Sequence, residues 1–408
     1  MNNNELLPHL FRTEYHKITS VLYRHFGFEH PEVAEDIASD TFLIAAETWG
    51  LKGLPENPVA WLHTVARNRA KDYLRRNKLF EQKISPTLQA DHDGWEEMVI
   101  DLSDAHIRDS QLQLMFAICQ PILTPEAQIG LALRILCGFG IDEIADAFLS
   151  NKETINKRLF RAKEKLREQQ VKIEFPPEAE IGTRIQAVLT TLYLLFNEGY
   201  YSCNKDTTLR KDLCLEAMRL TYLLVENEST NLPDANALIA LMCFHASRFD
   251  ARTDDNGEMI RYDEQDTNLW NDELISRGNH YLNLASKGKV NKYHLEAAIA
   301  YWHTIKTDSI KKWESILQLY NRLLQIAYSP IAALNRTYSL YKARGKQEAI
   351  AEAEKLQLNG NHLYHVLLGH LYTGVDQQTA IRHLQTALKL AKTTTEKTRI
   401  QKDLEKLV

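Results

Sequence analysis

The segment "GFGIDEIADAFLSNKETINKRLFRAKEKLRE", residues 138–168, has the pattern of two helices separated by a tight break. The first helix is expected from Ile141 to Phe148 and the second from Lys152 to Glu168. Ser150 and Glu153 have the S-x-x-E spacing of a capping box, which satisfies free backbone N–H groups where a helix begins. The sequence therefore predicts a helix-turn-helix here.

The second of these helices separates apolar from basic residues at 100° per residue. One side carries Ile155, Leu159, Ala162 and Leu166. Residues 152–172 contain eight bases and three acids, a local balance of +5. Such a helix can enter a major groove, whereas the alternative, an ordinary helical hairpin, does not require cations on its free face. The predicted DNA contacts are Lys152, Thr154, Asn156, Lys157, Arg158, Arg161 and Lys165.

A second basic helix is expected in "NPVAWLHTVARNRAKDYLRRNK", residues 57–78. Asn57 followed by Pro58 gives an N-cap and then proline at the first helical position. Leu62, Val65, Ala66 and Tyr73 fall on one face, and Arg67, Lys71, Arg75 and Lys78 form a row on another. The row is either a nucleic-acid surface or an ordinary solvated face. Arg69 lies among the apolar positions and is expected in an internal ion pair, for which an acid of the preceding helix is a candidate partner. Trp61 is expected in the core.

The 408 residues include only 16 Gly and 11 Pro, and apolar residues recur mostly at three- and four-residue steps. The fold class is therefore expected to be all-α. The start "MNNNELLPHL" has no basic stretch followed by an apolar run, and the window "IQAVLTTLYLLF" is too short and too polar to span a bilayer. These features predict a cytoplasmic protein with no membrane partner. Five cysteines without a C-x-x-C pair support neither a zinc ribbon nor a disulfide framework.

The chain divides into four expected parts. A helical block, residues 1–79, precedes an acidic linker, residues 80–109, in which eight acids outnumber two bases. A second helical block covers residues 110–173, and Pro176 and Pro177 break the pattern after it. Residues 178–408 form a longer helical array, in which Tyr341 and Tyr372 overlay at an offset of 31 residues. That period favours stacked helical hairpins of the tetratricopeptide kind, with a plain helical bundle as the alternative.

Several stretches together resemble a bacterial RNA polymerase sigma factor of the extracytoplasmic-function type. "AEDIASDTFLIAAETW" and "NPVAWLHTVARNRAKDYLRR" are similar to sigma region 2, and "LTPEAQIGLALRILCGFGIDEIADAFLSNKETINKRLFRAKEKL" is similar to sigma region 4. The tail segments "YLLFNEGYYS", "DARTDDNGEMIRYDEQD" and "SPIAALNR" resemble the C-terminal extension of the subgroup that carries a tetratricopeptide-like domain. The resemblance covers nearly the whole chain.

The resemblance implies a non-enzymatic factor whose partners are core RNA polymerase and promoter DNA. The minus-10 contacts would be Arg67, Asn68, Lys71, Arg75 and Arg76, and the helix of residues 152–168 would bind the minus-35 duplex. The helix of residues 31–48 would present a partly acidic face to the polymerase through Glu32, Asp36, Asp40 and Leu43. The linker would thread a cationic polymerase channel or serve as a disordered tether. The C-terminal domain would regulate the factor in cis, and an anti-sigma factor or another protein is left open as its partner.

The chain departs from the subgroup at two places. "AICQP", with Cys119 between Ile118 and Gln120, replaces a Cys-Cys-His-Pro-like string and lacks its ligands, so neither a metal nor a cofactor is expected. "LSNKE" replaces a proline-containing turn, which leaves the base preference open. Two other functions are alternatives: a helix-turn-helix regulator with a helical effector domain, and a hydrolase or metal enzyme that uses Glu198 or the acids around Asp254. The spacing of those acids excludes an EF-hand, because the first ligand position holds Arg252.

Overall fold

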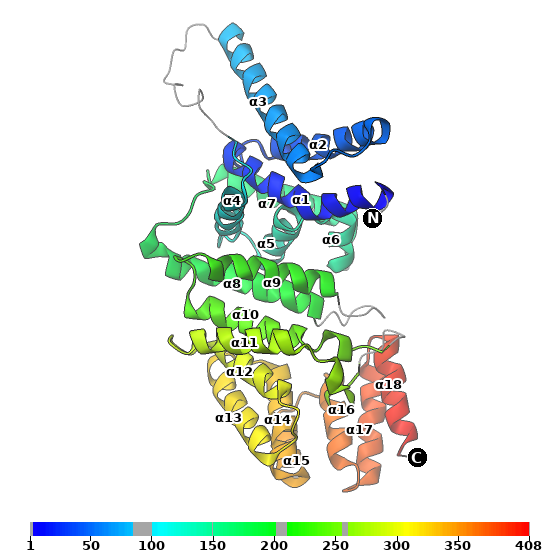
Figure 1. Ribbon diagram of the computed structural model, residues 1–408. Helices are drawn as coiled ribbons and strands as arrows, with labels where there is room; N and C mark the ends of the chain where they lie inside the picture. Colours follow the sequence, from blue (N-terminus) through cyan, green and yellow to red (C-terminus); the bar gives the residue numbers. More distant parts are fainter. Residues whose placement is uncertain (1–2, 85–99, 149, 201–209, 255–259, 408) are drawn as a thin grey trace. The chain divides into compact units, whose positions relative to one another are not determined.

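The computed structural model describes residues 3–84, 100–148, 150–200, 210–254 and 260–407. Within these ranges all regular secondary structure is helical, which confirms the predicted all-α class. The chain forms two compact units, residues 1–194 and residues 195–408 (Figure 1).

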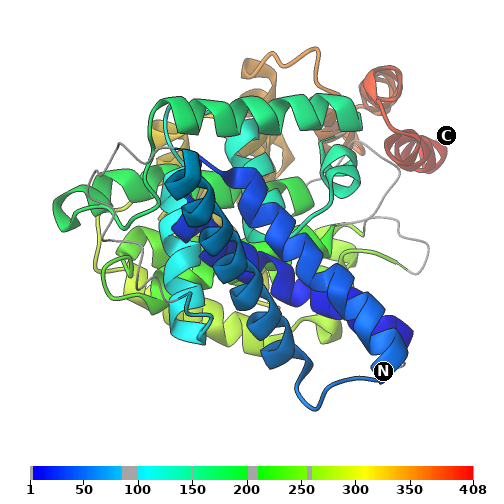
Figure 2. The ribbon, with the colours of Figure 1, turned by 90° about the horizontal axis from the view of Figure 1, so that it is seen from above.

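Among the described residues, nine helical segments begin in the first unit. They are α1 (Asn3–Phe26), α2 (Pro31–Lys52), α3 (Pro58–Ile84), α4 (Asp104–Ile118), α5 (Pro125–Leu131), the π-helical segment η2 (Ala132–Leu136), α6 (Ile141–Ala147), α7 (Lys152–Glu168) and α8 (Glu178–Tyr200). Figure 2 views these helices, coloured blue to green, from above. Helix α3 continues to Ile84 and α4 begins at Asp104, so both ends of the stretch expected to be a linker are helical. Residues 85–99, between them, lie outside the described residues.

Helix α1 is the centre of the first unit. It packs against α2, α3, α4 and η2. Four side chains of α1 are each at most 1% exposed: Tyr15, Ile18, Leu22 and Tyr23. Helices from both sides of the linker therefore cover this one helix. The sequence predicts two separate modules, α1–α3 and α4–α7. In the structure their described parts share one core.

The helix-turn-helix forms at the predicted place, and α7 has the predicted bounds. Its four predicted apolar residues, Ile155, Leu159, Ala162 and Leu166, are all buried. The predicted capping box is wrong. Asn151 caps α7, because its side-chain oxygen accepts from the N–H of Thr154 at 2.8 Å. A capping Glu of this kind is found at α6 instead. There the side chain of Glu143 accepts from the backbone N–H of Gly140 at 2.8 Å.

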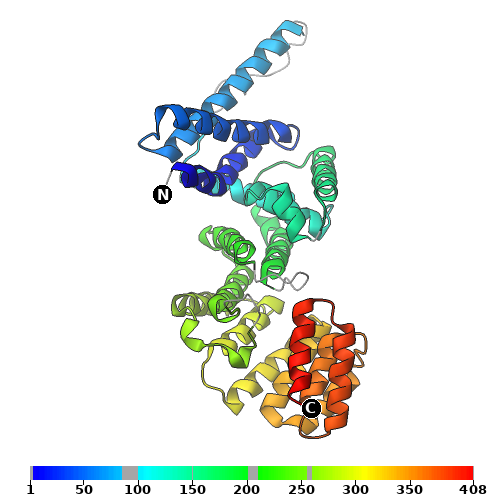
Figure 3. The same ribbon diagram turned by 90° about the vertical axis from the view of Figure 1, so that its right-hand side faces the viewer.

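The second unit continues from the end of α8 as a series of helices that pack on their sequence neighbours. They are α9 (Lys211–Glu226), α10 (Pro233–Ala246), α11 (Asp272–Ala285), α12 (Lys292–Thr304), α13 (Ile310–Ile326), α14 (Pro330–Arg344), α15 (Lys346–Lys355), α16 (His362–Tyr372), α17 (Gln377–Leu390) and α18 (Thr394–Glu405), with short 3-10 turns η3 (Phe249–Ala251), η4 (Tyr262–Glu264) and η5 (Thr267–Leu269). Helices α16, α17 and α18 lie side by side (Figure 1, Figure 3). Contacts also join α10 to α12 and α14 to α16, a pattern that stacked helical hairpins produce. The tetratricopeptide-like character stays a prediction.

The boundary between the units lies inside α8, later than the predicted domain start at residue 178. Arg184 donates to the carbonyl oxygen of Phe116 at 3.2 Å. Thr191 donates to the side chain of Gln128 at 2.8 Å. Most of α8 therefore packs with the first unit.

Candidate nucleic-acid interface

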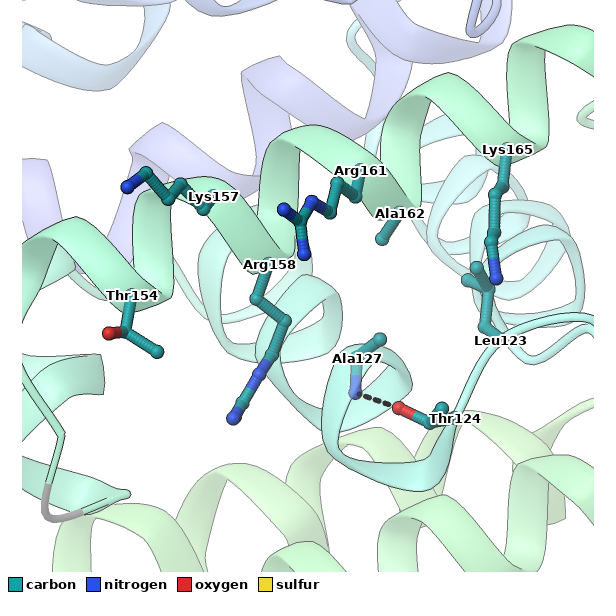
Figure 4. Close-up of a pocket in the computed structure, with 9 residues that line it drawn as sticks. All are labelled: Leu123, Thr124, Ala127, Thr154, Lys157, Arg158, Arg161, Ala162 and Lys165. Atoms are coloured by element: carbon teal, nitrogen blue, oxygen red, sulfur yellow. Dashed lines mark hydrogen bonds between the residues drawn. The ribbon is translucent and has the colours of Figure 1, made fainter.

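Helix α7 and the start of α5 border a groove of about 370 Å³. From α7 it is lined by Thr154, Lys157, Arg158, Arg161, Ala162 and Lys165, and from the other side by Leu123, Thr124 and Ala127. Arg158 and Lys165 extend from α7 towards the start of α5, on either side of Arg161 (Figure 4). Five of the seven residues predicted to bind minus-35 DNA are thus brought together along one groove. None of its lining residues is acidic.

The cations of this groove differ in how far they are already neutralised. Lys157 pairs with Glu153 one turn away at 2.6 Å. Arg158 lies 5.3 Å from the ring centre of Phe148, a cation–π contact that orients its guanidinium. Among the described residues, Arg161 and Lys165 have no ion-pair partner. These two side chains are therefore the most available to an anion such as a DNA phosphate.

Two predicted minus-35 residues lie outside the groove lining. Lys152 pairs with Asp142 of α6 at 2.7 Å, which ties the two helices of the helix-turn-helix together. Asn156 is exposed but lies five residues from Arg161, a rotation of about 140° around the helix. Their DNA contacts remain predictions, and the groove itself is built from the other five.

Helix α3 carries the predicted minus-10 residues. Asn57 caps it, as predicted, because its side-chain oxygen accepts from the N–H of Ala60 at 3.0 Å. Asn68, Lys71, Arg75 and Arg76 are exposed. Arg75 pairs with Asp72 at 3.1 Å. The side chain of Lys78, also expected in the basic row, lies outside the described residues.

Arg67 differs from the other residues of this set. It is only partly exposed, and its Nε donates to the backbone carbonyl of Ile100 at 3.0 Å. This bond joins α3 to the segment that precedes α4. The sequence pattern placed Arg67 in a basic row and contained no signal for a backbone acceptor 33 residues away.

The other side of α3 packs on α2. Trp61 is partly buried and meets Trp49 edge to face, with ring centres 5.3 Å apart. Arg69 pairs with Asp40 of α2 at 3.7 Å, so the partner is an acid of the preceding helix, but the two side chains are 42% and 53% exposed and the predicted internal location is wrong. These contacts hold the cationic side of α3 away from the core.

The predicted polymerase-binding residues share the outer face of α2. Glu32, Asp36, Asp40 and Leu43 are all exposed, with Leu43 at 58%. The inner face buries Val33, Ile37 and Ala45, while Ile44 is half-buried. The structure thus brings all four predicted residues onto one continuous face.

Sequence reasoning missed a buried charge cluster beneath these surfaces. Glu35 of α2 pairs with Lys163 of α7, and Arg134 of η2 lies 4.0 Å from the same carboxylate. The hydroxyl of Tyr23 also donates to Glu35, at 2.7 Å. Burial would raise the pKa of Glu35, but Lys163, Tyr23 and Arg134 together hold it below the usual value. The helical periodicity marks Lys163 only as one base among several.

Other candidate chemistry has less support. In the described part of the chain no group of three or more His, Cys, Asp or Glu could hold a metal ion. Burial raises the pKa of Cys119 and of Cys214 to about 12, so both are thiols at neutral pH. Glu198 is partly buried, which raises its pKa. Residues 255–259 of the acidic stretch after Asp254 lie outside the described residues.

No described helix combines the length and the apolar character that crossing a bilayer requires.

Comparisons with known proteins match two parts of the chain to family models. Residues 10–80, which span most of α1 and all of α2 as well as most of α3, match the model described as Sigma-70 region 2. Residues 184–286 match a model described as a family of unknown function, DUF6596. No solved structure matches the chain.

A relative of similar length matches nearly the whole chain. The "Uncharacterized protein R00370" of Rhizobium meliloti (strain 1021) is 33% identical over 386 residues, which are 93% of this chain and 91% of the relative. The similarity therefore extends through both compact units. The chain therefore belongs to one full-length family with R00370, and its residues 10–80 match sigma-70 region 2, which supports a sigma-70 factor.

Proposed function

We propose that this protein is a sigma factor of the extracytoplasmic-function type, which binds core RNA polymerase, directs it to promoters and is regulated in cis by its C-terminal unit. One observation carries the proposal. A chain with sigma-70 region 2 at residues 10–80 also has a cationic groove on the second helix of a helix-turn-helix. A factor that recognises promoters needs a surface that binds duplex DNA in addition to a module that binds polymerase.

The minus-35 duplex is assigned to the groove of α7. Arg161 and Lys165 are the cations best placed to neutralise backbone phosphates, because no described acid pairs with them. Thr154, Lys157 and Arg158 lie nearer the start of α7, the end of a recognition helix that reaches base edges. Arg or Lys reads guanine there through its O6 and N7 acceptors.

The minus-10 element is assigned to the exposed row on α3. Lys71 and Arg76 have no ion-pair partner among the described residues, and Asn68 supplies a donor and an acceptor for a base. Bases exposed as the strands separate can be bound on edges that are paired in the duplex. Arg67 is the first residue of this row. Its Nε already donates to the carbonyl oxygen of Ile100, so this atom is not available to DNA.

Core polymerase is assigned to the outer face of α2. Three acids precede the exposed Leu43 along the same face of α2, so the face offers a small apolar contact at the end of a negatively charged row. Such a row of charge speeds encounter with a basic partner surface, while the apolar contact slows dissociation. Regulation in cis is assigned to the second unit because fusion keeps it at high effective concentration near the first.

Transcription in vitro with purified core polymerase and a promoter library tests this proposal. A sigma factor gives initiation at a defined set of promoters only when core polymerase and this chain are both present. The alternative, a helix-turn-helix regulator, binds duplex promoter DNA without polymerase and does not restore initiation to core enzyme. That second result would refute the proposal.

The cis-regulatory role has its own test. A chain that ends at Tyr200 keeps all of α8, which packs with the first unit, and removes most of the second unit. Circular dichroism shows whether the shortened chain stays folded. A folded chain with unchanged promoter output and unchanged polymerase affinity would exclude regulation by the second unit.

A further inference from the structure

Two buried cations of the second unit lie beside the ring of Tyr262. Arg248, just before η3, is 7% exposed, and its guanidinium carbon lies 5.4 Å from the centre of that ring. Lys312 of α13 is 2% exposed, and its Nζ donates to the Tyr262 hydroxyl at 2.7 Å. Neither cation forms an ion pair with any residue that the structure describes. Two positive charges are thus withdrawn from water beside one uncharged phenol.

The hydrogen-bond partners of these two cations are neutral groups. A terminal nitrogen of Arg248 donates to the hydroxyl of Tyr200 at 3.4 Å, while its buried Nε has no partner in the described part of the chain. Lys312 also donates to the carbonyl oxygen of Ile305 at 2.6 Å. A buried charge is strongly unfavourable unless an opposite charge and hydrogen bonds replace the solvent. The two cations therefore lack a counter-ion.

Two further buried nitrogens beside the same ring have no hydrogen-bond partner among the described residues. They are Nε1 of Trp270 and Nδ1 of His303. The centres of these two rings lie 6.2 Å and 4.8 Å from the centre of the Tyr262 ring. An indole N–H can only donate, and nearly all buried polar groups in folded proteins are hydrogen-bonded. The cluster therefore contains donors without matching acceptors.

The cluster stays positively charged at neutral pH. Burial lowers the pKa of Lys312 to about 8, so most of this amine is protonated at pH 7. Burial, Arg248 and Lys312 together lower the pKa of His303 to about 3, so its imidazole is neutral. Asp308, whose charge favours the protonated form of Lys312, pairs with Lys342 at 2.9 Å instead. No described acid therefore balances the cluster by direct contact.

We propose that Arg248, Lys312, Trp270 and His303 bind a small tetrahedral oxyanion, of the inorganic phosphate or sulfate kind, beside Tyr262. Such an ion supplies both the counter-charge and the acceptors that the cluster lacks. The four side chains come from four separate places in the chain, and a tetrahedral ion offers oxygens in four directions, whereas a carboxylate offers only two. Because the two cations are deeply buried, a free ion that the site can enclose fits better than the head group of a larger molecule.

The proposed anion site shares no residue with the proposed DNA and polymerase surfaces. The inference therefore goes beyond the proposed function and does not depend on it. Its tests use the full chain alone, without DNA or polymerase, so their failure is distinguishable from a failure of the proposed function.

The first test titrates the full chain with inorganic phosphate and follows calorimetric heat and thermal unfolding. A ligand that binds only the folded state raises the unfolding temperature as its concentration passes Kd. We expect a saturable heat that corresponds to one ion per chain, and a rise in unfolding temperature that sodium chloride at the same ionic strength does not give. Glycerol 3-phosphate, which carries the same group on a three-carbon body, should bind more weakly than phosphate.

Two variants and a matched control locate the ion. Arg248→Met and Lys312→Met each replace one buried cation by an apolar side chain, whereas Arg277→Met removes an exposed cation that pairs with Glu273 at 2.6 Å. Loss of one charge-assisted hydrogen bond should weaken phosphate binding at least about tenfold in each of the first two variants. Arg277→Met should match the wild type. Without phosphate, Arg248→Met should be no less stable than the wild type, because it removes a buried charge that has no counter-ion.

Sulfate, which keeps its charge near neutral pH, tests the part that Lys312 plays. At pH 8 about half of the Lys312 amines are protonated before binding, and a bound anion favours the protonated form. Sulfate binding should therefore take up as much as about half a proton per ion, measured as a dependence of the binding heat on the ionisation enthalpy of the buffer. Lys312→Met should abolish this uptake, and Arg277→Met should retain it.

The wild type alone can overturn the proposal. If phosphate gives no saturable response in the wild type, there is no anion site, whether or not the variants fold. A response that persists unchanged in folded Arg248→Met or folded Lys312→Met, as judged by circular dichroism, would also overturn the assignment to this cluster. Tighter binding of glycerol 3-phosphate than of phosphate would overturn the assignment to a free ion.

Discussion

Asp40 on α2 and Arg69 on α3 form an ion pair with 3.7 Å between their charged groups. Both helices lie in the part of the chain that matches sigma-70 region 2. Asp40 also belongs to the proposed polymerase face, so part of its charge is already balanced. Glu32, on the same face, lies 3.8 Å from His30. Asp36 has no ion-pair partner among the described residues. The three acids of this face are therefore unequal.

Asp36→Asn should weaken binding to core polymerase more than Asp40→Asn does. Removing the Asp36 charge, which no described cation offsets, lowers the association rate by a few fold and reduces the dependence of that rate on salt. Asp40→Asn leaves Arg69 exposed to solvent and removes less net field from the face. Association kinetics at low and moderate salt measure both. Equal losses from the two variants would mean that Arg69 does not offset the charge of Asp40, and no loss from either would mean that the α2 face is not the docking surface.

Arg161→Ala should weaken binding to duplex minus-35 DNA by about tenfold and reduce the salt dependence by about one phosphate contact. Arg161 lines the groove without an ion-pair partner in the described residues. Arg167→Ala is the matched control, because Arg167 lies on the same helix outside the groove lining and pairs with Glu164. Binding at several salt concentrations separates the two. A control as defective as Arg161→Ala would argue against the groove as the interface.

Local patterns predicted much of this architecture. The bounds and buried side of α7 follow from its 3.6-residue periodicity, and the cap at Asn57 follows from the residues beside it. The sequence contains no comparable pattern for the contacts that join distant elements. Lys163 meets Glu35 across 128 residues, and Arg67 meets Ile100 across 33. Periodicity along one helix says which residues face inward, but it does not say which element they meet there.

The start of α7 shows that sequence patterns also fail to decide some local contacts. Ser150 and Asn151 are both good cap residues, and the sequence pattern favoured Ser150 because Glu153 follows at capping-box spacing. The structure uses Asn151, and Glu153 pairs with Lys157 instead. Asn151→Ala should therefore destabilise the first unit by about 1 kcal/mol, whereas Ser150→Ala should have a smaller effect. Urea unfolding of the two variants gives the comparison, and the reverse order would restore the original prediction.

Gly278→Ala should destabilise the second unit by about 1–3 kcal/mol. An added Cβ at Gly278 of α11 would lie 2.6 Å from the ring of Phe244, which is fully buried in α10. The helices must then move apart. Gly182→Ala, in α8, meets nothing within 4 Å and should stabilise its helix by up to about 1 kcal/mol. Thermal unfolding should shift in opposite directions for the two variants. A neutral Gly278→Ala would show that α10 and α11 do not pack this closely.

Asp403 of α18 should make the stability of the second unit depend on pH in the acid range. Its carboxylate is 7% exposed, pairs with Arg261 and lies 3.3 Å from His370 Nε2. Burial alone raises the pKa of Asp403, but His370 and Arg261 outweigh it and lower the pKa from 3.8 to about 2. Because the folded pKa lies below the unfolded one, the stabilisation is complete above about pH 4 and disappears as the pH falls towards 2.

Asp403→Asn should accordingly cost about 2 kcal/mol at neutral pH, and its difference from the wild type should shrink to near zero at about pH 2. Asp263→Asn is the control, since Asp263 is exposed in η4, which begins directly after Arg261. Denaturant unfolding from pH 7 to pH 2 isolates the effect, because the other carboxylates titrate equally in the wild type and the variant. A difference that stays constant across this range would show that packing of Asp403, rather than its charge, holds α18 to the loop.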